Sequence, residues 1–180
     1  YSSGGFQDIW GSCSSDVYSV GENGSILHYN GSAWSAVDSG TTADLMSVWG
    51  TSASDIFAVG SSGTILHYSG ISWSAMTSGF GESLHGVWGS SSSDVFAVGS
   101  LGTILHYNGS AWSSMSSGTT YTLEDVWGSA SSNVLAVGGN GTILHWNGST
   151  WSPMTSGVSD TLYDVWGASG SDVFAVGGFN

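Results

Sequence analysis

The chain has 180 residues, 40% of them hydrophobic, which predicts a globular protein with a core of domain size. It contains 13 acidic residues and neither Lys nor Arg, so its formal net charge is −13. The lack of cationic side chains argues against nucleic-acid partners, against Lys- and Arg-dependent phosphoryl transfer, and against adhesion to anionic lipid.

The same composition bears on where the protein works. No apolar run approaches the roughly 20 residues that span a bilayer, so we expect no membrane insertion. The chain begins at Tyr1 without a hydrophobic leader, as expected of a mature or excised piece. Because a surface without Lys and Arg offers no cleavage site to trypsin-like proteases, we predict a secreted or cell-surface protein.

Self-similarity at a fixed spacing dominates the sequence. A Trp-Gly pair recurs every 39 residues, at Trp10, Trp49, Trp88, Trp127 and Trp166. A histidine keeps the same spacing, at His28, His67, His106 and His145. Such a period indicates tandem copies of one supersecondary unit that needs its neighbours to bury its hydrophobic faces.

One complete copy, residues 84–122, contains four short runs of β-branched and aromatic residues. In chain order these are GVWG around Trp88, DVFAVG from Asp94, TILHY from Thr103 and AWSSM from Ala111. Their composition and spacing predict four β-strands and no helix. The second and third runs are almost continuously apolar, which is typical of a sheet buried on both faces.

The connections between these strands carry turn residues. Asn-Gly lies between the third and fourth strands of three copies and predicts a two-residue type I′ hairpin. Between the first and second strands we expect an acid to accept backbone N–H bonds within its own turn, with Asn133 as an isosteric substitute. These acids are Asp16, Asp55, Asp94 and Asp172.

Four antiparallel strands in 39 residues are one blade of a β-propeller, in which successive sheets pack face to face. We predict an all-β, five-bladed propeller in one domain over 1–180, with units at about 6–44, 45–83, 84–122, 123–161 and 162–180. The fifth unit holds only its first two strands. Three explanations stay open: a ring that closes imperfectly, strands from another chain, and a longer parent protein.

The units resemble a bacterial propeller repeat of the pattern DVWAVG…GTILHYNG…W, present here as DVFAVGSLGTILHYNGSAW at 94–112. The resemblance covers the whole chain and extends more distantly to BNR or Asp-box propellers and photosystem-assembly-factor-like repeats. It implies a propeller in a secreted or surface protein, but no single activity, because propellers host lectins, hydrolases and scaffolds alike. The hairpin at 108–112 is one residue shorter than an Asp-box and lacks its acid.

The repeated histidines and Cys13 are the first candidates for metal binding or nucleophilic chemistry. The third strand lies towards the outside of a blade, so four His from four blades cannot converge on one metal ion. We expect each His to form hydrogen bonds within its own blade. Cys13 stands where the other copies have Ser or Ala, and a single cysteine allows no intramolecular disulfide. We therefore predict no metal and no cofactor.

Enzymatic activity has little support in the residues. A sialidase-like hydrolase, which the resemblance suggests, would need an Arg cluster that the chain lacks. A glycoside hydrolase needs only two carboxylates. The acids available for it are Glu82, Glu124, Asp125, Asp160 and Asp164. They occur one or two per unit, so we expect no enzyme and keep this activity as the last alternative.

Differences between the copies concentrate at one end of the predicted sheets. In an antiparallel blade the fourth-to-first and second-to-third connections share one end. These loops vary between copies, whereas the loops of the opposite end barely change. Drift on exposed loops explains this variation, and the sharper interpretation is a ligand face. Its candidate residues are Phe80, Glu82, His85, Leu101, Tyr121, Glu124, Asp160 and Tyr163.

Two further sets of residues point to sugars. The fourth-strand tryptophans are candidate stacking platforms, with core packing as the alternative. They are Trp34, Trp73, Trp112 and Trp151. Candidate N-glycosylation sites, most of which turn chemistry also explains, are Asn23, Asn30, Asn108, Asn140 and Asn147.

These observations predict a non-catalytic extracellular propeller that recognises a protein partner or assembles with itself. A multivalent lectin with one weak glycan site per blade is the first alternative.

Overall fold

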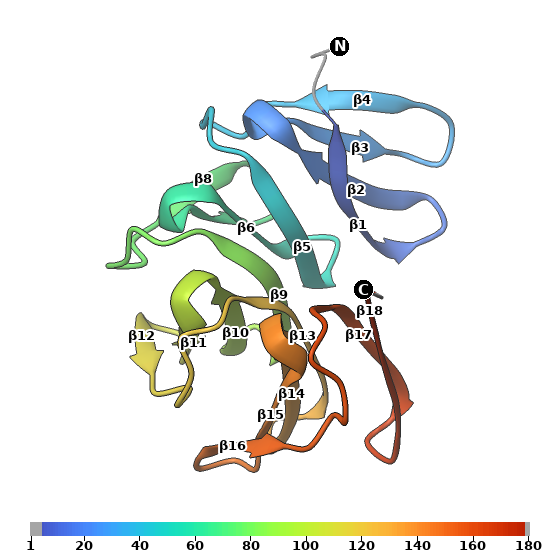
Figure 1. Cartoon of the computed structure of the whole chain (residues 1–180). Coiled ribbons are helices and arrows are strands. Elements are labelled where there is room, and N and C mark those ends of the chain that lie inside the picture. Colours follow the sequence, from blue (N-terminus) through green and yellow to red (C-terminus); the bar gives the residue numbers. More distant parts are fainter. Residues whose placement is uncertain (1–4, 179–180) are drawn as a thin grey trace. The chain divides into compact units, whose positions relative to one another are not determined.

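The structure is a computed structural model that describes residues 5–178. It is all-β, as predicted, with four antiparallel sheets of four strands and a fifth of two strands. The strands of every sheet lie side by side in chain order (Figure 1). Contacts divide the chain into two compact units, with the division between Leu84 and His85.

The first unit holds two sheets. The first sheet consists of β1 (Phe6–Cys13), β2 (Asp16–Gly21), β3 (Ile26–Tyr29) and β4 (Trp34–Val37). The second consists of β5 (Leu45–Ser52), β6 (Asp55–Gly60), β7 (Ile65–Tyr68) and β8 (Trp73–Met76). β5 packs on β1 and β2, so the two sheets bury a shared core. That core includes Val20, Leu45, Ile56 and Leu66.

The second unit repeats this packing. The third sheet consists of β9 (Leu84–Ser91), β10 (Asp94–Gly99), β11 (Ile104–Tyr107) and β12 (Trp112–Met115). The fourth consists of β13 (Leu123–Ala130), β14 (Asn133–Gly138), β15 (Thr142–Trp146) and β16 (Trp151–Met154). The fifth contains β17 (Leu162–Ser169) and β18 (Asp172–Gly177). β13 packs on β10, and β17 packs on β13 and β14.

The Trp-Gly repeat joins neighbouring sheets within each unit. The glycine directly after the tryptophan leaves room for the tryptophan ring of the preceding sheet. A Cβ on Gly50 would lie 2.9 Å from the Trp10 ring, and a Cβ on Gly128 would lie 2.6 Å from the Trp88 ring. The expectation that these tryptophans pack beside small residues between blades is therefore confirmed for Trp10, Trp88 and Trp127, whose rings meet a glycine of the next sheet. Trp166 of the fifth sheet is instead 60% exposed.

The prediction that the chain has no helix is wrong in one detail. Each four-stranded sheet has a three-residue 3-10 turn between its second and third strands. These turns are η1 (Glu22–Gly24), η2 (Ser61–Gly63), η3 (Ser100–Gly102) and η4 (Gly139–Gly141). Their middle residue is left-handed in every case, with φ between 55° and 56°.

The type I′ prediction for the hairpins is also wrong. Tyr29 pairs with Trp34, so the loop between them has four residues. Of the Asn-Gly pair only Gly31 has a positive φ, of 90°. The Asn30 side-chain oxygen accepts the N–H groups of the two residues at the end of the loop, both at 3.0 Å. The asparagine therefore caps the turn with its side chain, as Asn108 and Asn147 also do.

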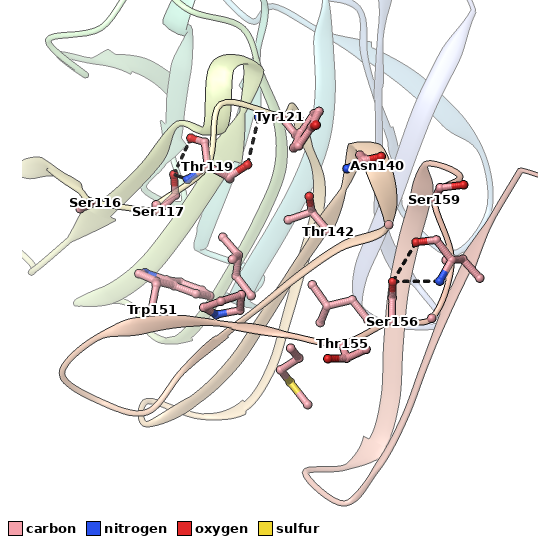
Figure 2. Close-up of a pocket in the computed structure, with 18 residues that line it drawn as sticks. Ser116, Ser117, Thr119, Tyr121, Asn140, Thr142, Trp151, Thr155, Ser156 and Ser159 are labelled. Atoms are coloured by element: carbon pink, nitrogen blue, oxygen red, sulfur yellow. Dashed lines mark hydrogen bonds between the residues drawn. The ribbon is translucent and has the colours of Figure 1, made fainter.

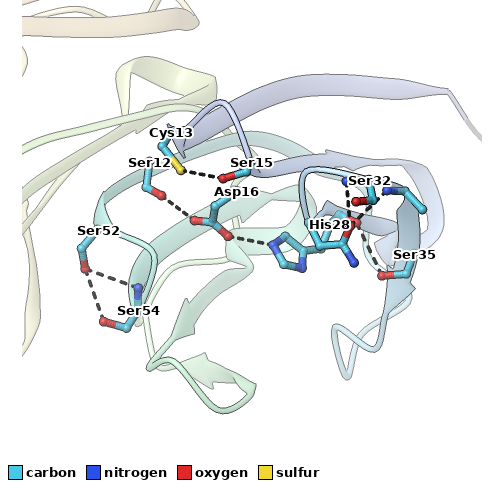
Figure 3. Close-up of polar contacts among 11 residues, drawn as sticks. Ser12, Cys13, Ser15, Asp16, His28, Ser32, Ser35, Ser52 and Ser54 are labelled. Carbon is cyan, nitrogen blue, oxygen red and sulfur yellow. Dashed lines mark hydrogen bonds and ion pairs between the residues drawn. The ribbon is translucent and has the colours of Figure 1, made fainter.

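In the four full sheets the Asp or Asn at the start of the second strand bridges strands with its side chain. Asp16 accepts the Ser12 hydroxyl at 2.5 Å and the Nε2–H of His28 at 2.7 Å (Figure 3). The same bond joins Asp55 to His67 at 2.7 Å. Asn133 takes this role in the fourth sheet, where its oxygen lies 2.7 Å from His145 Nε2. The prediction that each His bonds within its own blade is thus confirmed.

Candidate ligand face

The loops of the predicted ligand face are fixed by a repeated serine. In every fourth-to-first loop a serine hydroxyl accepts the N–H of the residue two positions later and donates to its carbonyl, at 3.0–3.3 Å. These serines are Ser39, Ser78, Ser117 and Ser156. The loops therefore present their variable side chains from a rigid backbone.

Glycines of the 3-10 turns hold the same loops from the other side. Gly141 has φ 62°, and a Cβ there would lie 2.1 Å from the Val158 carbonyl oxygen. The equivalent glycines Gly24, Gly63 and Gly102 meet their loops in the same way. Only glycine permits both the left-handed backbone and this close approach.

Two of the eight candidate residues lie in the first unit. Phe80 is 39% exposed, and Glu82 is also exposed. The Ser78 hydroxyl fixes the backbone of Phe80 itself, so the Phe80 ring is offered to solvent from a rigid position. The other six candidates lie in the second unit.

His85 and Glu124 bond to each other. Their Nδ1 and Oε2 atoms are 3.0 Å apart, and His85 Nε2 lies 3.2 Å from the Ser100 hydroxyl. Both side chains are 24% exposed. They occupy equivalent positions on β9 and β13, so the pair ties two neighbouring sheets. Its first role is structural, and its exposed edge borders the ligand face.

Three candidate side chains are largely exposed. Leu101 is 65% exposed, Tyr121 50% and Tyr163 60%. Leu101 is the left-handed residue of η3, with φ 55°, where the other three turns have Asn or Ser. A leucine in this conformation is strained by roughly 1–2 kcal/mol, which marks the position as a candidate for binding.

A pocket of about 760 Å³ opens between the third and fourth sheets of the second unit (Figure 2). Thr119 and Tyr121 line one side, from the loop after β12. Trp151, Met154 and Val158 line another, from β16 and the loop after it. β10 and β13 contact each other between these two sheets, and the pocket lies beside β15 and β16 of the fourth sheet.

The pocket lining mixes apolar side chains with hydroxyl groups. Met154 is 52% exposed and Val158 51%. Ser116, Thr142 and Thr155 add hydroxyls, and Asn140 borders the pocket from η4 (Figure 2). Val158 and Met154 were missed by the sequence analysis. Val158 occupies the same loop position as Phe80, which was chosen, so the signal for Val158 was present in the repeat.

The fourth-strand tryptophans are mostly packed. Trp73 is 7% exposed and Trp112 8%, so neither offers an open face to a sugar ring. Trp73 meets Tyr18 of the preceding sheet edge to face, at 6.1 Å between ring centroids. Trp151 meets Phe96 in the same way at 5.9 Å and is half-buried. Trp34 belongs to the first sheet and remains 39% exposed. For Trp73 and Trp112 the core-packing alternative holds.

Carboxylates on the first strands reach forward to the next sheet. Asp8 accepts the Ser47 hydroxyl and the Val48 N–H, both at 2.8 Å. Asp125 accepts the Val165 N–H at 3.0 Å and is hydrogen-bonded to Asp164. Burial raises the pKa of Asp125 to about 8, and Asp164 adds to the shift. The sequence analysis noted Asp125 and Asp164 but not their pairing.

This pairing does not fit the carboxylates of a glycoside hydrolase. Such enzymes hold their two acids roughly 5–9.5 Å apart with substrate or water between them. Asp125 and Asp164 instead touch each other, and Asp125 is further occupied by a backbone N–H. Asp160, a third candidate acid, contributes its carbonyl to a bond from the Gly141 N–H at 2.8 Å.

The remaining candidates are accessible surface groups. All five sequon asparagines are exposed, and their glycosylation stays a prediction. Cys13 is exposed, and the Ser15 hydroxyl lowers the pKa of its thiol. Within residues 5–178, no three His, Cys, Asp or Glu side chains are grouped to hold a metal ion. No helix in that range has the length and apolarity to cross a membrane.

Neither a protein-family model nor a curated protein sequence matches the chain. Solved structures do. YCF48 from Cyanidioschyzon merolae aligns at TM-score 0.66 and 17% identity, over 89% of this chain and 59% of that one. YCF48 bound to a D1 peptide aligns at 0.52 and 14%, over 97% and 90%. The RRP9 WD40 repeats align at 0.74 and 12%, over 96% and 60%.

The chain thus spans about three fifths of the length of two of these proteins. At such low identity the likeness concerns the fold alone. Together with four full blades and a two-stranded fifth, it shows that this chain has the β-propeller fold.

Proposed function

We propose that the chain is a non-catalytic, secreted or cell-surface recognition module that binds an extended peptide segment of a protein partner in the pocket of its second unit. The observation that carries the proposal is the pocket itself. Exposed apolar side chains stand beside hydroxyl groups on loops that Ser117 and Ser156 hold rigid (Figure 2). Such a surface provides an apolar anchor point and hydrogen bonds for a peptide backbone.

Two observations support a polypeptide ligand over a reaction. One structural neighbour, YCF48, is bound to a D1 peptide, which shows that a related fold takes such ligands. In this chain, the only carboxylate pair described above is saturated by its own contacts.

The composition supports an extracellular setting, because a chain without Lys and Arg resists trypsin-like proteases.

Charge narrows the ligand class. The chain has formal charge −13 and no cationic side chain other than His. Its field steers basic partners towards it and repels acidic ones. We therefore expect a peptide with one large apolar residue flanked by Lys or Arg, whose affinity falls as salt is added.

The test is selection of random dodecapeptides displayed on phage against the immobilised chain. Basic peptides with an apolar anchor should emerge, and Tyr121→Ala and Val158→Ser should each weaken their binding about tenfold. Ile71→Ser is the matched control, because Ile71 is an 89% exposed apolar residue of a different loop in the first unit.

A glycan array run in parallel separates the lectin alternative. Glycan binding that Tyr121→Ala abolishes, with no peptide recovered, would replace the proposal by a lectin site in the same pocket. Selected peptides that bind both pocket variants as tightly as the unaltered chain would also contradict it.

A further inference from the structure

The third and fourth sheets enclose a second hollow beside the pocket described above, which we call the aromatic groove. It has a volume of about 530 Å³. His106 of β11 and Ser113 of β12 border it from the third sheet, and Trp146 and Thr150 border it from the fourth. The Trp146 ring contacts the Phe96 ring of β10, at 6.1 Å between centroids. The aromatic groove therefore lies on the side of the fourth sheet that faces the third.

Trp146 is the main wall of the aromatic groove. Its Nε1–H donates to the Ser131 carbonyl at 3.1 Å, which fixes the plane of the ring. The Trp151 ring lies 5.7 Å away, at an angle of 39°, and also borders the groove. Both tryptophans are half-buried. The groove thus has a broad aromatic surface that is positioned before a ligand arrives.

The fourth sheet departs from the repeat at this groove. At the position of Trp146 the other full sheets have a tyrosine, namely Tyr29, Tyr68 and Tyr107. At the position of Thr150 they have Ala33, Ser72 and Ala111. Both changes border the same groove, and together they add aromatic surface and a threonine hydroxyl to it.

The first unit shows what the same positions do elsewhere in the chain. Tyr18, the equivalent of Phe96, is 3% exposed, and its hydroxyl is hydrogen-bonded to Tyr68. In the second unit Phe96 and Trp146 replace both tyrosines. The two hydroxyls that bond to each other in the first unit are therefore missing from the second.

Hydrogen-bonding groups stand around the aromatic wall. Within residues 5–178 the Thr150 hydroxyl forms no hydrogen bond, because only its backbone N–H donates to Asn147. The Ser149 hydroxyl donates to Asn147 at 2.9 Å, which leaves its oxygen free to accept. His106 donates its Nε2–H to Asp94 at 2.6 Å, so its Nδ1 carries a lone pair. The aromatic groove therefore offers both a donor and acceptors to a ligand.

This combination matches one class of ligand. A sugar ring has an apolar C–H face that packs on an aromatic ring and a rim of hydroxyls that need hydrogen bonds. The chain has formal charge −13 and neither Lys nor Arg, so it repels anionic sugars and has no cationic side chain other than His to bind them. The chemistry of the groove and the charge of the chain together select a neutral sugar.

We propose that the aromatic groove binds a neutral pyranose residue of a glycan. The C–H face of the sugar lies on Trp146, and its hydroxyls bond to Thr150 and to His106 Nδ1. Ser116 and Trp151 border both the groove and the pocket, so the two sites are neighbours (Figure 2). Sugar binding here requires no peptide in the pocket and goes beyond the proposed function.

The test is a titration of the whole chain with the methyl glycosides of glucose, galactose, mannose and N-acetylglucosamine, followed by saturation-transfer NMR. At least one of them should bind saturably. Trp146→Ala should weaken that binding about tenfold or more, because it removes the stacking surface. Methyl glucuronide should bind more weakly than the tightest neutral glycoside, because the chain repels its carboxylate.

Two substitutions that other copies already carry provide a test if Trp146→Ala does not fold. Thr150→Ala copies Ala111 and keeps the backbone bond to Asn147. It should weaken sugar binding about two- to tenfold, because it removes one hydrogen bond. Trp146→Tyr copies Tyr107 and should bind more weakly than the unaltered chain, because its ring is smaller. Melting temperatures from circular dichroism check that both variants are folded.

Tyr121→Ala is the matched control. Tyr121 is a 50% exposed aromatic residue that lines the pocket but not the aromatic groove. This variant should bind the glycoside as the unaltered chain does, even when it has lost the displayed peptides. Sugar binding at the groove and peptide binding at the pocket can therefore fail separately.

Four results would overturn the inference. The first is that no neutral glycoside binds saturably, and the second is that folded Trp146 and Thr150 variants bind as tightly as the unaltered chain. The third is loss of sugar binding in Tyr121→Ala, which would place the sugar in the pocket. The fourth is a glucuronide that binds at least as tightly as the neutral glycosides.

Discussion

The identical strands β10 and β18 differ only in their neighbours. Phe96 and Val98 are buried to 1% and 0% exposure in the third sheet, whereas Phe174 and Val176 are 62% and 59% exposed in the fifth. The hexapeptide alone therefore does not determine burial. In a repeat protein each sheet supplies the environment of the next, and the same residue is core or surface according to which strands cover it.

The largest difference in stability should come from removing the equivalent phenylalanine ring of each strand, Phe96 in β10 or Phe174 in β18. Phe96→Ala should lower the free energy of unfolding by about 3–5 kcal/mol, because it leaves a cavity in a packed core. Phe174→Ala should change it by less than about 0.5 kcal/mol, because the ring is mostly in water. Urea denaturation measures both. Equal losses would mean that the fifth sheet is covered as the third is.

The acid that begins each strand offers a second comparison. Asp94→Ala should destabilise by about 1–3 kcal/mol, because His106 and Ser90 lose their acceptor. Asp172→Ala should be nearly neutral. Asp94→Asn serves as control and should recover most of the loss, as Asn133 does naturally. If Asp94→Ala lowers the free energy of unfolding no more than Asp172→Ala does, the acid does not stabilise the sheet by bridging strands.

The stability of the junction between the fourth and fifth sheets should depend on pH, because the pKa of Asp125 is raised there. The raised pKa of Asp125 means that the folded chain binds a proton which the unfolded chain releases near pH 4. Its contribution to stability is complete below that pH and is lost as the pH rises through about 8. Asp164→Ser copies the arrangement at Ser47 and should weaken this dependence without abolishing it, because burial, the largest cause of the raised pKa of Asp125, remains. The expected gain is on the order of 1 kcal/mol at pH 8.

Melting temperatures of the unaltered chain and Asp164→Ser between pH 5 and pH 9 measure the effect. Parallel curves for the two proteins would show that Asp164 does not contribute to the raised pKa of Asp125.

The smallest change in stability is expected at Leu101 of η3, where the other three turns have Asn or Ser. Leu101→Asn should stabilise by about 0.5–1 kcal/mol, because Asn tolerates the left-handed backbone that Leu101 adopts. Asn140 occupies the equivalent position of η4 with the same φ, so η4 shows that asparagine fits this turn. A thermal melt detects the gain. Destabilisation would show that Leu101 makes contacts which outweigh its backbone strain.

The fold was predictable because every copy of the repeat carries the same sequence signals. Trp, His, Gly and the apolar runs recur in register, so four strands per unit can be inferred from any one copy and are checked by the others. The details that failed depend on side chains acting over a few residues. Asn30 caps its loop with its own carboxamide, so Asn-Gly did not signal the two-residue turn.

The candidate site was predictable only in part. Variation between copies pointed to Tyr121 and Leu101, which are exposed as expected. The pocket is lined by residues from two neighbouring copies, an arrangement that no single copy encodes. Likewise, Trp73 is covered by Tyr18 of the preceding sheet, whereas Trp34 has no preceding sheet in its unit and stays open.

The joint between Trp10 and Gly50 has a consequence for how such chains grow. In one Trp-Gly dipeptide, the tryptophan packs on the following sheet and the glycine leaves room for the tryptophan of the preceding sheet, as Trp127 and Gly128 do. A tandem duplication of the gene segment therefore delivers matched joints at once, without compensating mutations. Adding or removing whole units then leaves the packing at each such joint unchanged. Replacing the glycine, as in Gly128→Val, should disrupt the joint, because a side chain there would clash with the Trp88 ring.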